Sequence, residues 1–485
     1  MRISFTPHNN LYFGKKIQQP QLEYKPRDFK VVEPEITIQD IIDEAADCLE
    51  CKNPRCVVAC PNNNPIPMFM HWVKKGDIDN AGLVLRAYQP LPACTAVCFH
   101  YCEDNCVKGI KGDSVPIHYI ESTIGKYTED IPVSAEPTGR KVAIIGGGPA
   151  GIACAKELMK KGHEVHIFDS HRELGGVLRY GIPSFRLHRE AFQKEVKWLK
   201  QNGAVFHLNT QVGVDVKPDD FRKMGIDAIF IASGAGIPKH LNIPGEDLNG
   251  VVNSHSFLER VKLAELKSEL YDVGQKVIVI GGGNVAMDCA RTSLRLADDN
   301  CGDKDVTVVY RRSEKDMPAR KNEIDDAKEE GVNFKYLLKP VKILSQYDMN
   351  NPEKGSAVDK VGGVKFEKMI LSEPDENGKR KISPSGEFEI IEADTVVYAL
   401  GSVPKRTIQN SFAESGINLV ANEAGQADIN PDTKMTSVYW IFAGGDVATA
   451  GKPADMTHAI RAGRDAAGAI DKYLSTLPAP EPENA

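Results

Sequence analysis

The sequence predicts an α/β protein in which a small helical domain precedes two domains built on parallel sheets. Three observations predict this. Eight cysteines gather between Cys48 and Cys106, short β-branched runs alternate with helical patterns after about residue 140, and one glycine motif occurs twice, at Gly146 and Gly281. A chain of 485 residues is also too long for one ordinary core.

The composition is typical of a globular protein, with 41% hydrophobic and 26% charged residues. A net charge of −7 argues against a nucleic-acid partner, because phosphate binding relies on clustered Lys and Arg. The first residues show no pattern of a signal peptide, and no apolar run reaches the ~18–20 residues that span a bilayer. We expect a cytoplasmic location, where thiols stay reduced unless they bind metal or do redox chemistry.

The first part of the chain, residues 1–136, is expected to be helical. Residues 1–35 are polar and proline-bearing, and we interpret them as an extended arm. Helical spacing of apolar residues begins after Thr37, a plausible N-cap, and continues through "MFMHWVKKGDIDNAGLVLRAY" and "VPIHYIESTIGKYTED". The turn-rich stretch 132–139 then separates this domain from the rest.

The first glycine loop lies in "RKVAIIGGGPAGIACAKEL" (140–158), between a predicted strand and a predicted helix. Gly146 permits a tight turn, Gly148 permits close approach of a pyrophosphate, and Gly151 lets the helix pack on the strand. A second strand ends on Asp169, where an acid can accept the ribose hydroxyls. This pattern predicts an adenine dinucleotide at the helix N-terminus.

The second glycine loop, in "QKVIVIGGGNVAMDCARTSLRL" (275–296), has Gly281 and Gly283, with Ala286 in the third position. The strand that follows ends on Arg311 and Arg312 instead of an acid. Two guanidiniums suit a 2′-phosphate, so the loop favours NADP(H) over NAD(H). The alternative is that one arginine is only a solvated charge at the strand end.

Two stretches near the end complete the pattern. "VYWIFAGGDVATAG" (438–451) is an apolar strand that turns through Gly444 and Gly445 into Asp446. "MTHAIRAGRDAAGAI" is a helix with a face of small residues. Residues 475–485 are rich in proline and acid, and we expect them to be disordered.

The clustered cysteines form two runs, Cys48-x2-Cys51-x4-Cys56-x3-Cys60-Pro61 and Cys94-x3-Cys98-x3-Cys102-x3-Cys106. Structural zinc usually takes two CxxC pairs or histidines at fixed spacing, and disulfides are disfavoured in the cytosol. A run closing on C-x3-C-P resembles the iron–sulfur ligation of ferredoxins, whose last cysteine often serves the other cluster. The runs therefore predict two [4Fe-4S] clusters. Cys154 and Cys289 stand alone in predicted helices, which indicates packing and not disulfide chemistry.

The cysteine runs and glycine loops, together with "GGVLRYGIPSFRL" (175–187), "NIPGED" (242–247) and "IFAGGD" (441–446), resemble a known family over about residues 35–475. It is the family of the small (β) chain of NADPH-dependent glutamate synthase. That family includes the large subunit of NADH-dependent ferredoxin:NADP oxidoreductase and the N-terminal part of dihydropyrimidine dehydrogenase. The resemblance implies two Rossmann-like dinucleotide-binding domains of the flavin disulfide-reductase type.

The resemblance also implies where the cofactors lie. FAD is expected at the first loop, with Asp446 bonding its ribityl chain and residues 175–183 beside its ring, and NADP(H) at the second loop. The FAD domain is expected over 140–248 and 405–474, with the NADP(H) domain inserted at 249–404 between two crossover strands. The candidate cofactor-binding residues are Gly146, Gly148, Pro149, Ala150, Gly151, Asp169, Gly175, Gly176, Arg179, Gly181, Ile182, Gly281, Gly283, Asn284, Val285, Ala286, Arg311, Arg312, Gly401, Gly445, Asp446 and Thr457.

For the clusters, the resemblance implies that Cys48, Cys51 and Cys56 share one with Cys106, whereas Cys60 joins Cys98 and Cys102 in the other. Two residues compete as the fourth ligand of that second cluster. Cys94 is the thiolate within the run, but the family pattern points to the position after "VPIHYI", which here is Glu121. We take Glu121 as the predicted ligand. Phe99, where the family usually has proline, departs from the pattern.

Together these features predict an oxidoreductase subunit. NADPH carries hydride, a cluster moves one electron, and FAD is the usual converter between them, so no side-chain nucleophile or general base is required. We expect a separate partner subunit, which is a flavin subunit handling NADH and ferredoxin if the chain is of the transhydrogenase type. "CKNPRCVVACP" and the following "IPMF" favour that type. The alternatives are the glutamate synthase small chain, whose partner is the large chain, and a solitary NADPH-dependent reductase of small acceptors.

Overall fold

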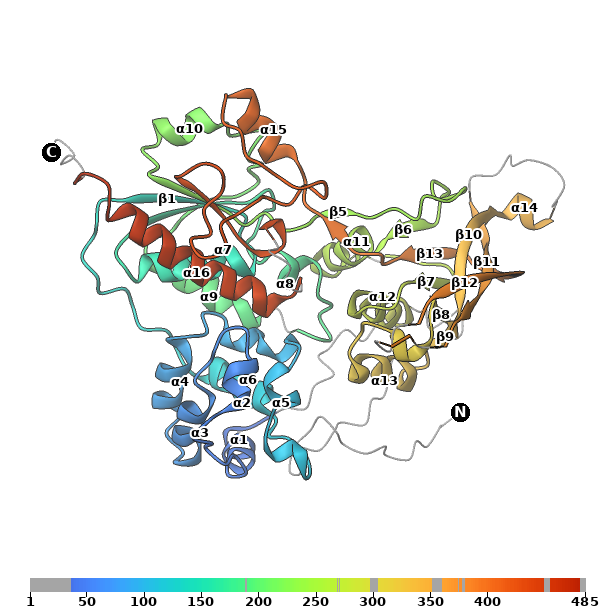
Figure 1. The fold of residues 1–485 in the computed structure, drawn as a ribbon, viewed down its shortest axis with the longest axis horizontal. Helices are drawn as coiled ribbons and strands as arrows, with labels where there is room; N and C mark the ends of the chain where they lie inside the picture. Colours follow the sequence, from blue (N-terminus) through green and yellow to red (C-terminus); the bar gives the residue numbers. More distant parts are fainter. Residues whose placement is uncertain are drawn as a thin grey trace.

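The computed structural model describes residues 36–187, 190–267, 269, 271–296, 304–350, 360–373, 375–376, 380–448 and 454–479. The expected arm over residues 1–35 lies outside these ranges. Figure 1 shows a helical domain in blue below a first sheet that contains β1, and a second sheet that contains β7 on the right. This arrangement is the α/β architecture, with a helical domain in front, that the sequence predicts.

The helical domain begins as the sequence indicates. Thr37 caps α1 (Ile38–Ala45): its hydroxyl accepts the N–H of Asp40, whose carboxylate accepts the N–H of Thr37 in return. Apolar faces of the following helices then meet in one core that includes Phe69, Leu85 and Ile120. The other elements are α2 (Arg55–Ala59), α3 (Ile66–Lys74), α4 (Ile78–Arg86), η1 (Pro92–Val97), α5 (Tyr101–Asp104), η2 (Lys108–Ile110) and α6 (Ile117–Tyr127).

The first sheet is parallel and has the order β15-β4-β1-β2-β3. Its edge strand comes from far along the chain, because β15 pairs Ile441 with Ile229 of β4. A sequence-split domain produces this topology. The strands are β1 (Lys141–Ile145), β2 (Glu164–Phe168), β3 (Val205–His207), β4 (Ala228–Ile231) and β15 (Ile441–Ala443).

The second sheet repeats this plan with the parallel order β6-β13-β7-β8-β9. A three-stranded antiparallel sheet, β10-β11-β12, packs beside it, and β5 pairs with β14 where the chain crosses between the two halves. The strands are β5 (Ile237–Pro238), β6 (Val251–Asn253), β7 (Lys276–Ile280), β8 (Asp305–Tyr310), β9 (Asn333–Tyr336), β10 (Leu338–Ser345), β11 (Val361–Leu371), β12 (Ile382–Glu392), β13 (Thr395–Tyr398) and β14 (Ser402–Val403).

Helices cover both parallel sheets, and their apolar faces form the cores against the buried strands. Figure 1 shows α7 and the long α16 lying together beside the first sheet. The helices are α7 (Pro149–Met159), α8 (Val177–Tyr180), α9 (Glu190–Gln201), α10 (Pro218–Lys223), α11 (Ser254–Lys267), α12 (Asn284–Arg295), η3 (Glu314–Asp316), α13 (Lys321–Glu329), α14 (Gln346–Asn350), α15 (Thr407–Glu414), η4 (Gly445–Ala448) and α16 (Met456–Leu474).

A buried cluster of four charges joins the helical domain to the first sheet. Arg86 of α4 lies 2.8 Å from the Asp130 carboxylate and 3.1 Å from that of Glu195 on α9. Lys156 of α7 contacts the same two carboxylates. Two positive and two negative charges offset one another here, which a dry site requires. The junction between the two domains is therefore a specific packed contact.

The first residues of the C-terminal segment contact the first sheet domain. Leu477 packs against the first core, and the Arg140 guanidinium donates to its carbonyl at 3.2 Å. Arg140 also donates to the carbonyl of Pro478, and the expected disorder of residues 475–485 stays a prediction, of which 480–485 lie outside the described ranges. Within the part of the chain that the structure describes, no helix is long and apolar enough to cross a membrane.

Candidate functional site

The first glycine loop joins β1 to α7 and leaves open space at the helix N-terminus. Gly146 has φ +106°, and a Cβ there would lie 2.4 Å from the carbonyl oxygen of Ala232. A Cβ on Gly151 would lie 1.9 Å from the carbonyl oxygen of Gly146, so the loop and α7 pack without room for a side chain. At Gly148 the nearest atom to such a Cβ is the Gly176 Cα, 3.8 Å away. The first glycine loop therefore has room for a bound group that approaches Gly148 from the solvent side.

Asp169 follows β2, at the position expected for the ribose acid. One carboxylate oxygen accepts the N–H of Gly147 at 2.8 Å, and the other accepts the N–H of His171 at 2.8 Å. The carboxylate therefore holds the glycine loop itself, a role that the motif alone did not indicate. The His171 ring forms hydrogen bonds that the carboxylates of Asp169 and Glu259 accept, and these bonds raise the pKa of His171 to about 9.

Three segments from distant parts of the chain meet near Ala150, the second residue of α7 after Pro149. A Cβ on Gly445 would lie 3.2 Å from the Ala150 Cβ and 3.9 Å from that of Ala459 on α16. Thr457, also in the first turn of α16, is 5% exposed, and its hydroxyl oxygen has no hydrogen-bond partner among the described residues. A bound group that reaches this turn would satisfy it, so the site fits the FAD that the sequence predicts.

The carboxyl of Asp446 lies in the short helix η4, in the same region. Burial raises the pKa of Asp446, and the charge of Asp455 at the start of α16 raises it further. A hydrogen-bond donor from a ligand would stabilise the ionised form. The structure thus places Asp446 as a half-buried group near the first turn of α16, which suits the predicted contact with the ribityl chain.

The segment 175–183 packs on the first glycine loop. Gly175 donates its N–H to the Gly147 carbonyl at 2.8 Å, and a Cβ on Gly176 would lie 2.8 Å from the Gly148 Cα. Gly181 and Ile182 both donate backbone N–H groups to the carbonyl of Val177. The segment is therefore held beside the open face of the loop, where the sequence predicts the flavin ring.

Arg179 differs from a simple cofactor contact. Its side chain is buried and pairs with Glu173, and its guanidinium lies 5.9 Å from the ring centroid of Tyr180 and 6.0 Å from that of Phe192. These contacts give Arg179 a packing role within the segment. Its contact with a cofactor stays a prediction.

The second glycine loop has the same open geometry. Gly281 has φ +151°, whereas no heavy atom of the described residues lies within 4 Å of a Cβ on Gly283. Ala286 is buried in the second core and Val285 is 48% exposed beside the loop. The Asn284 side chain accepts the N–H of Arg320 at 2.9 Å and so fixes the loop that follows β8. This loop fits a second dinucleotide.

The two arginines after β8 lie at the surface of the second half. Arg312 donates to the carbonyl of Arg380 at 3.0 Å, and Arg311 is exposed. No carboxylate among the described residues pairs with Arg311. Gly401, on the crossover after β13, has φ +84°, and no heavy atom of the described residues lies within 4 Å of a Cβ placed there. Arg312 has an acidic neighbour in Asp316, whose pKa is lowered by hydrogen bonds from Ser313 and further by the Arg312 charge.

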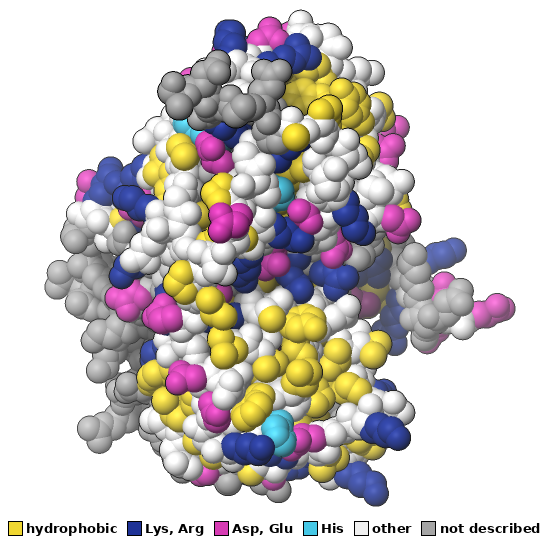
Figure 2. All heavy atoms as spheres, turned by 90° about the vertical axis from the view of Figure 1, so that its left-hand side faces the viewer, with side chains coloured by type: hydrophobic (Ala, Val, Ile, Leu, Met, Phe, Trp, Pro, Cys, Tyr) yellow, Lys and Arg dark blue, Asp and Glu magenta, His cyan; other side chains and the backbone are white. Residues whose placement is uncertain are grey.

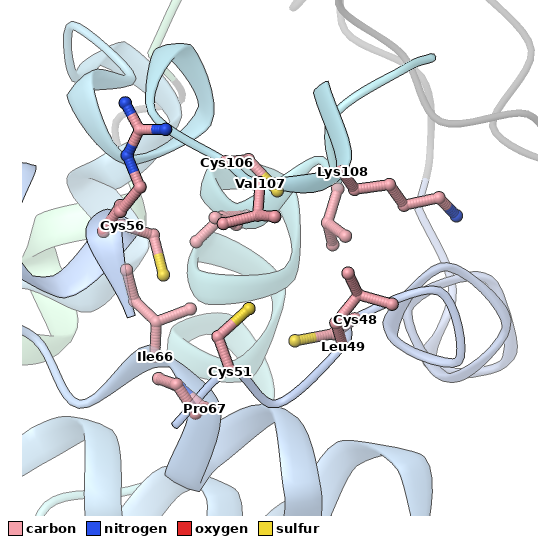
Figure 3. A pocket seen from close by; sticks show the side chains of 12 residues that line it. Cys48, Leu49, Cys51, Cys56, Ile66, Pro67, Cys106, Val107 and Lys108 are labelled. Atoms are coloured by element: carbon pink, nitrogen blue, oxygen red, sulfur yellow. The ribbon is translucent and has the colours of Figure 1, made fainter. Parts of the chain in front are cut away.

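Four cysteines meet at one pocket of the helical domain. Cys48, Cys51, Cys56 and Cys106 line it together with apolar side chains such as Ile66. Figure 3 shows the labelled cysteine side chains turned toward one another across this pocket. Burial, and next the charge of Cys106, raise the pKa of Cys56 to about 11. Four soft ligands around a small apolar-walled space fit an iron–sulfur cluster, which would stabilise the thiolates.

The other cysteine group is more deeply buried and includes a carboxyl. Burial raises the pKa of Cys60 to about 11, and Glu121 is the next cause. The Glu121 charge also raises the pKa of Cys98 and of Cys102, although burial is the largest cause for both. Glu121 is 4% exposed, and burial raises its own pKa to about 8. The three thiols and the Glu121 carboxyl therefore lie close enough together for the carboxyl charge to act on each thiol.

Cys94 lies elsewhere. Its side chain is fully buried in the core of the first sheet, together with Leu91 and Cys154. Burial raises the pKa of Cys94, and the charges that act on it belong to Glu195 and Lys156. None of Cys60, Cys98 and Cys102 contributes to that shift. The 3-10 turn η1 thus directs Cys94 away from the other cysteines of its run.

The sequence interpretation missed the polar groups that hold this second site. Asn64 donates to Glu121 at 2.5 Å and Gln89 donates to it at 3.4 Å. The N–H of His100, in left-handed conformation, donates to the Cys98 sulfur at 3.2 Å. Asn64 lies 57 residues from Glu121, so no local pattern could have indicated this contact.

Family comparisons agree with the two-part architecture. Residues 140–463 match the family described as pyridine nucleotide-disulphide oxidoreductase. Residues 25–131 match the family described as "Dihydroprymidine dehydrogenase domain II, 4Fe-4S cluster". These matches bear out the prediction of FAD, NADP(H) and [4Fe-4S] chemistry, without giving the number of clusters.

Solved structures share the fold. The chain is similar to Mycobacterium tuberculosis FprA in complex with NADPH, with a TM-score of 0.55 and 20% identity over 70% of this chain and 85% of that one. It is also similar to Lactococcus lactis thioredoxin reductase, with a TM-score of 0.50 and 23% identity over 70% of this chain and 100% of that one.

Relatives of known name are closer in sequence. The glutamate synthase [NADPH] small chain of Escherichia coli is 35% identical over 448 residues, which are 89% of this chain and 91% of that one. The β subunit of NADP(+)-dependent formate dehydrogenase from Moorella thermoacetica is 33% identical over 88% of this chain, which spans 61% of that protein. The chain therefore belongs to the pyridine nucleotide-disulphide oxidoreductases, in the family of the NADPH glutamate synthase small chains, and is an NADPH-dependent flavin and iron–sulfur oxidoreductase.

Proposed function

We propose that this chain carries electrons between NADP(H) and a separate partner chain by way of FAD and two [4Fe-4S] clusters. The observation that carries the proposal is the division of seven cysteines and Glu121 into two sites of different burial. Cys48 and Cys51 of the first site are half-exposed, whereas Cys60 and Cys102 of the other are buried, and α16 contacts the residues after Cys60 through Arg461 and Arg464. A buried site next to the flavin and an exposed one beyond it suit a relay.

Residues of this chain bind FAD and NADP(H) at two separate glycine loops. FAD accepts a hydride from NADPH and releases single electrons, which is the chemistry that the clusters cannot supply. The first glycine loop holds FAD and the second holds NADP(H), with Arg311 and Arg312 on the 2′-phosphate. The FAD domain comprises 140–248 and 405–474, and the NADP(H) domain 249–404; the shared strand order of the two sheets supports this division.

We place the contact with the partner chain at the exposed site. Large apolar side chains stand in the segments that carry its cysteines: Leu49 is 62% exposed, Val58 83% and Ile110 65%. Exposed apolar groups of this kind mark interaction surfaces. Figure 2 shows hydrophobic side chains gathered on the lower half of its face, at the height of the helical domain in Figure 1.

A glutamate synthase large chain is the first candidate partner, because two relatives named as its small chain align over 91% and 92% of their lengths. The flavin subunit of a ferredoxin:NADP transhydrogenase, which the motif around Cys56 favours, is the second candidate. Co-purification from the native cell, followed by identification of the bound chain, distinguishes the two.

The experiment that tests the proposal is the composition of protein purified without oxygen. We expect about eight irons, as many sulfides and one FAD per chain, as two [4Fe-4S] clusters and one flavin require. NADPH should bleach the flavin and then reduce the clusters. About two zinc ions per chain, with little iron, would contradict the cluster proposal.

A further inference from the structure

A hydrogen bond joins the loop of the buried cysteine site to the first turn of α16. Tyr101 stands between Cys98 and Cys102, and its hydroxyl donates to the Asp455 carboxylate at 2.7 Å. Asp455 is the N-cap of α16: its other oxygen accepts the N–H of His458 at 2.9 Å. The rings of Tyr101 and His458 meet edge to face, with centroids 5.8 Å apart. The loop and the helix end are therefore one connected unit.

The same helix end faces the flavin site. Its first turn carries Thr457, whose buried hydroxyl lacks a partner among the described residues, and Ala459, which lies beside Gly445. The Asp455 side chain is only 1% exposed, and its charge raises the pKa of Asp446 after burial has done so. Asp455 thus lies between the second cluster site and the residues proposed to contact the flavin.

A hydrogen bond to an ionised carboxylate is stronger and shorter than one between neutral groups. Here it is partly buried, and it links positions that are 354 residues apart. Covalent connection alone cannot hold such positions together. The Tyr101–Asp455 contact therefore joins the loop of Cys98 directly to the first turn of α16, whereas Arg461 and Arg464, later in α16, donate to the carbonyls of Pro61 and Asn62.

We propose that Tyr101 is a positioning residue for electron transfer between the flavin and the second cluster. This inference rests on the proposed function. With FAD and the clusters bound, the two electrons of the hydride that NADPH supplies would leave the flavin one at a time for the clusters, and one proton would go to water for each pair of electrons. The rate of such a step falls steeply with separation. The Tyr101–Asp455 bond keeps that separation short and constant.

Two conservative variants test the role. Tyr101→Phe removes only the hydroxyl. Asp455→Asn removes the charge but retains a good N-cap for α16. Tyr127→Phe is the matched control, because Tyr127 belongs to the same domain and is 48% exposed. Flavin bleaching by NADPH and cluster reduction are followed separately in anaerobic stopped flow, after iron and FAD content have been measured.

We expect iron content, FAD content and flavin bleaching to match the wild type in all three variants. Cluster reduction should slow about tenfold or more in Tyr101→Phe and in Asp455→Asn, because small misplacements of reacting groups are costly. The double variant should be no slower than the slower single one, since both changes act on the same contact: Tyr101→Phe removes its donor, and Asp455→Asn replaces its charged acceptor by a neutral amide. The control should behave as the wild type.

The midpoint potential of the flavin, measured in each variant, distinguishes an effect of changed position on the electron-transfer rate from an effect of changed charge. Tyr101→Phe leaves the carboxylate with one donor fewer, which should shift the potential to more negative values. Asp455→Asn removes the negative charge and should shift it to more positive values. A slower electron transfer in both variants, despite opposite shifts in driving force, can come only from geometry.

Two results would overturn the inference. One is an unchanged rate of cluster reduction in Tyr101→Phe. The other is a rate that follows the potential, faster in Tyr101→Phe and slower in Asp455→Asn. A wild-type protein without flavin or iron would instead refute the proposed function, and the inference would fall with it.

Discussion

At the scale of single residues, the most informative side chain is Glu121. A buried carboxyl is costly unless hydrogen bonds or a cation stabilise it, and Glu121 is 4% exposed. Asn64 and Gln89 both donate to its Oε1. The carboxyl adds to the raised pKa values of Cys60, Cys98 and Cys102, as expected of a group that shares their site. We propose that Glu121 is the fourth ligand of the second cluster.

The first prediction concerns this ligand. Glu121→Ala should remove or alter one of two cluster signals in electron paramagnetic resonance and lower the iron content, because the second cluster loses an oxygen ligand. Cys94→Ser should retain both signals and lower stability only as Cys154→Ser does, since both cysteines pack in the same core. Loss of a cluster in Cys94→Ser, with both signals intact in Glu121→Ala, would make Cys94 the ligand.

The second prediction concerns cofactor preference. Replacing Arg311 and Arg312 by Ala should weaken NADPH by about ten- to hundredfold, because each charge-assisted bond contributes about 1.5–3 kcal/mol, while NADH binding changes little. Lys315→Ala, an exposed cation in the same loop, is the control and should leave both affinities unchanged. Titration of flavin-reduced or apo protein with each nucleotide measures the effect. Equal weakening of NADPH and NADH would show that the arginines serve the fold.

At the scale of elements, each glycine loop is the junction of a buried strand with a helix. Gly146 and Gly281 take conformations with positive φ that other residues avoid, so they shape the turns. Gly148 and Gly283 have φ of −81° and −93°, which any residue can adopt. These two glycines are therefore not required by the backbone. The reason for a missing side chain there is the space that the cofactor needs.

The third prediction uses this difference. Gly148→Val should abolish FAD retention while the cluster signals and NADPH binding remain, because its side chain occupies the place of the pyrophosphate. Gly283→Val should do the reverse, with FAD retained and NADPH binding lost. Each variant is the control for the other. Stoichiometric flavin in the Gly148→Val protein would mean that FAD binds elsewhere.

At the scale of the whole molecule, ionic contacts hold the two dinucleotide halves together. Arg186, which follows the flavin segment, lies 2.8 Å from Asp288 on α12. His171, beside the first loop, lies 3.2 Å from Glu259 on α11. The His171 ring also stacks on Tyr180, with centroids 4.4 Å apart. Because both ends of these contacts are charged groups, the joint between the halves depends on pH.

The fourth prediction concerns that dependence. The pKa of His171 is raised from 6.5 to about 9 by Asp169 first and Glu259 next, so the folded state favours the charged ring. The stabilisation is present in full below the unfolded pKa and is lost as pH rises through about 9. The thermal midpoint should fall more from pH 6.5 to 9 in the wild type than in His171→Asn. The side chain is partly exposed, so the difference should be small.

Glu259→Gln provides the matched variant, because it removes one of the two carboxylates that contact His171. Its thermal midpoint should fall less between pH 6.5 and 9 than that of the wild type, but more than that of His171→Asn. Identical pH profiles for the wild type and His171→Asn would contradict the assignment of this contact. If the thermal midpoints of the two proteins differed in their pH dependence only below pH 6, the titrating groups would be carboxylates and not His171.

Local features of the chain were predictable because they depend on neighbouring residues. The cap at Thr37, the strand before Gly146 and the open positions at Gly148 and Gly283 follow from residue type and spacing, and the structure has all of them. The paired α/β halves and the helical domain follow from the change in hydrophobic period. The contact of Leu477 with Arg140 was not predictable in this way, because the two residues lie 337 positions apart in the sequence.

Only the tertiary structure decided how distant residues meet. Cys94 belongs to a cysteine run in the sequence, yet the turn of η1 buries it beside Glu195 and Lys156. Tyr101 and Asp455 meet across 354 residues of chain. Spacing determines local backbone geometry, but contacts between domains depend on packing of whole surfaces, which no local pattern records. The sequence alone therefore determined the cofactors this protein is expected to use, and the fold decided which side chains hold and connect them.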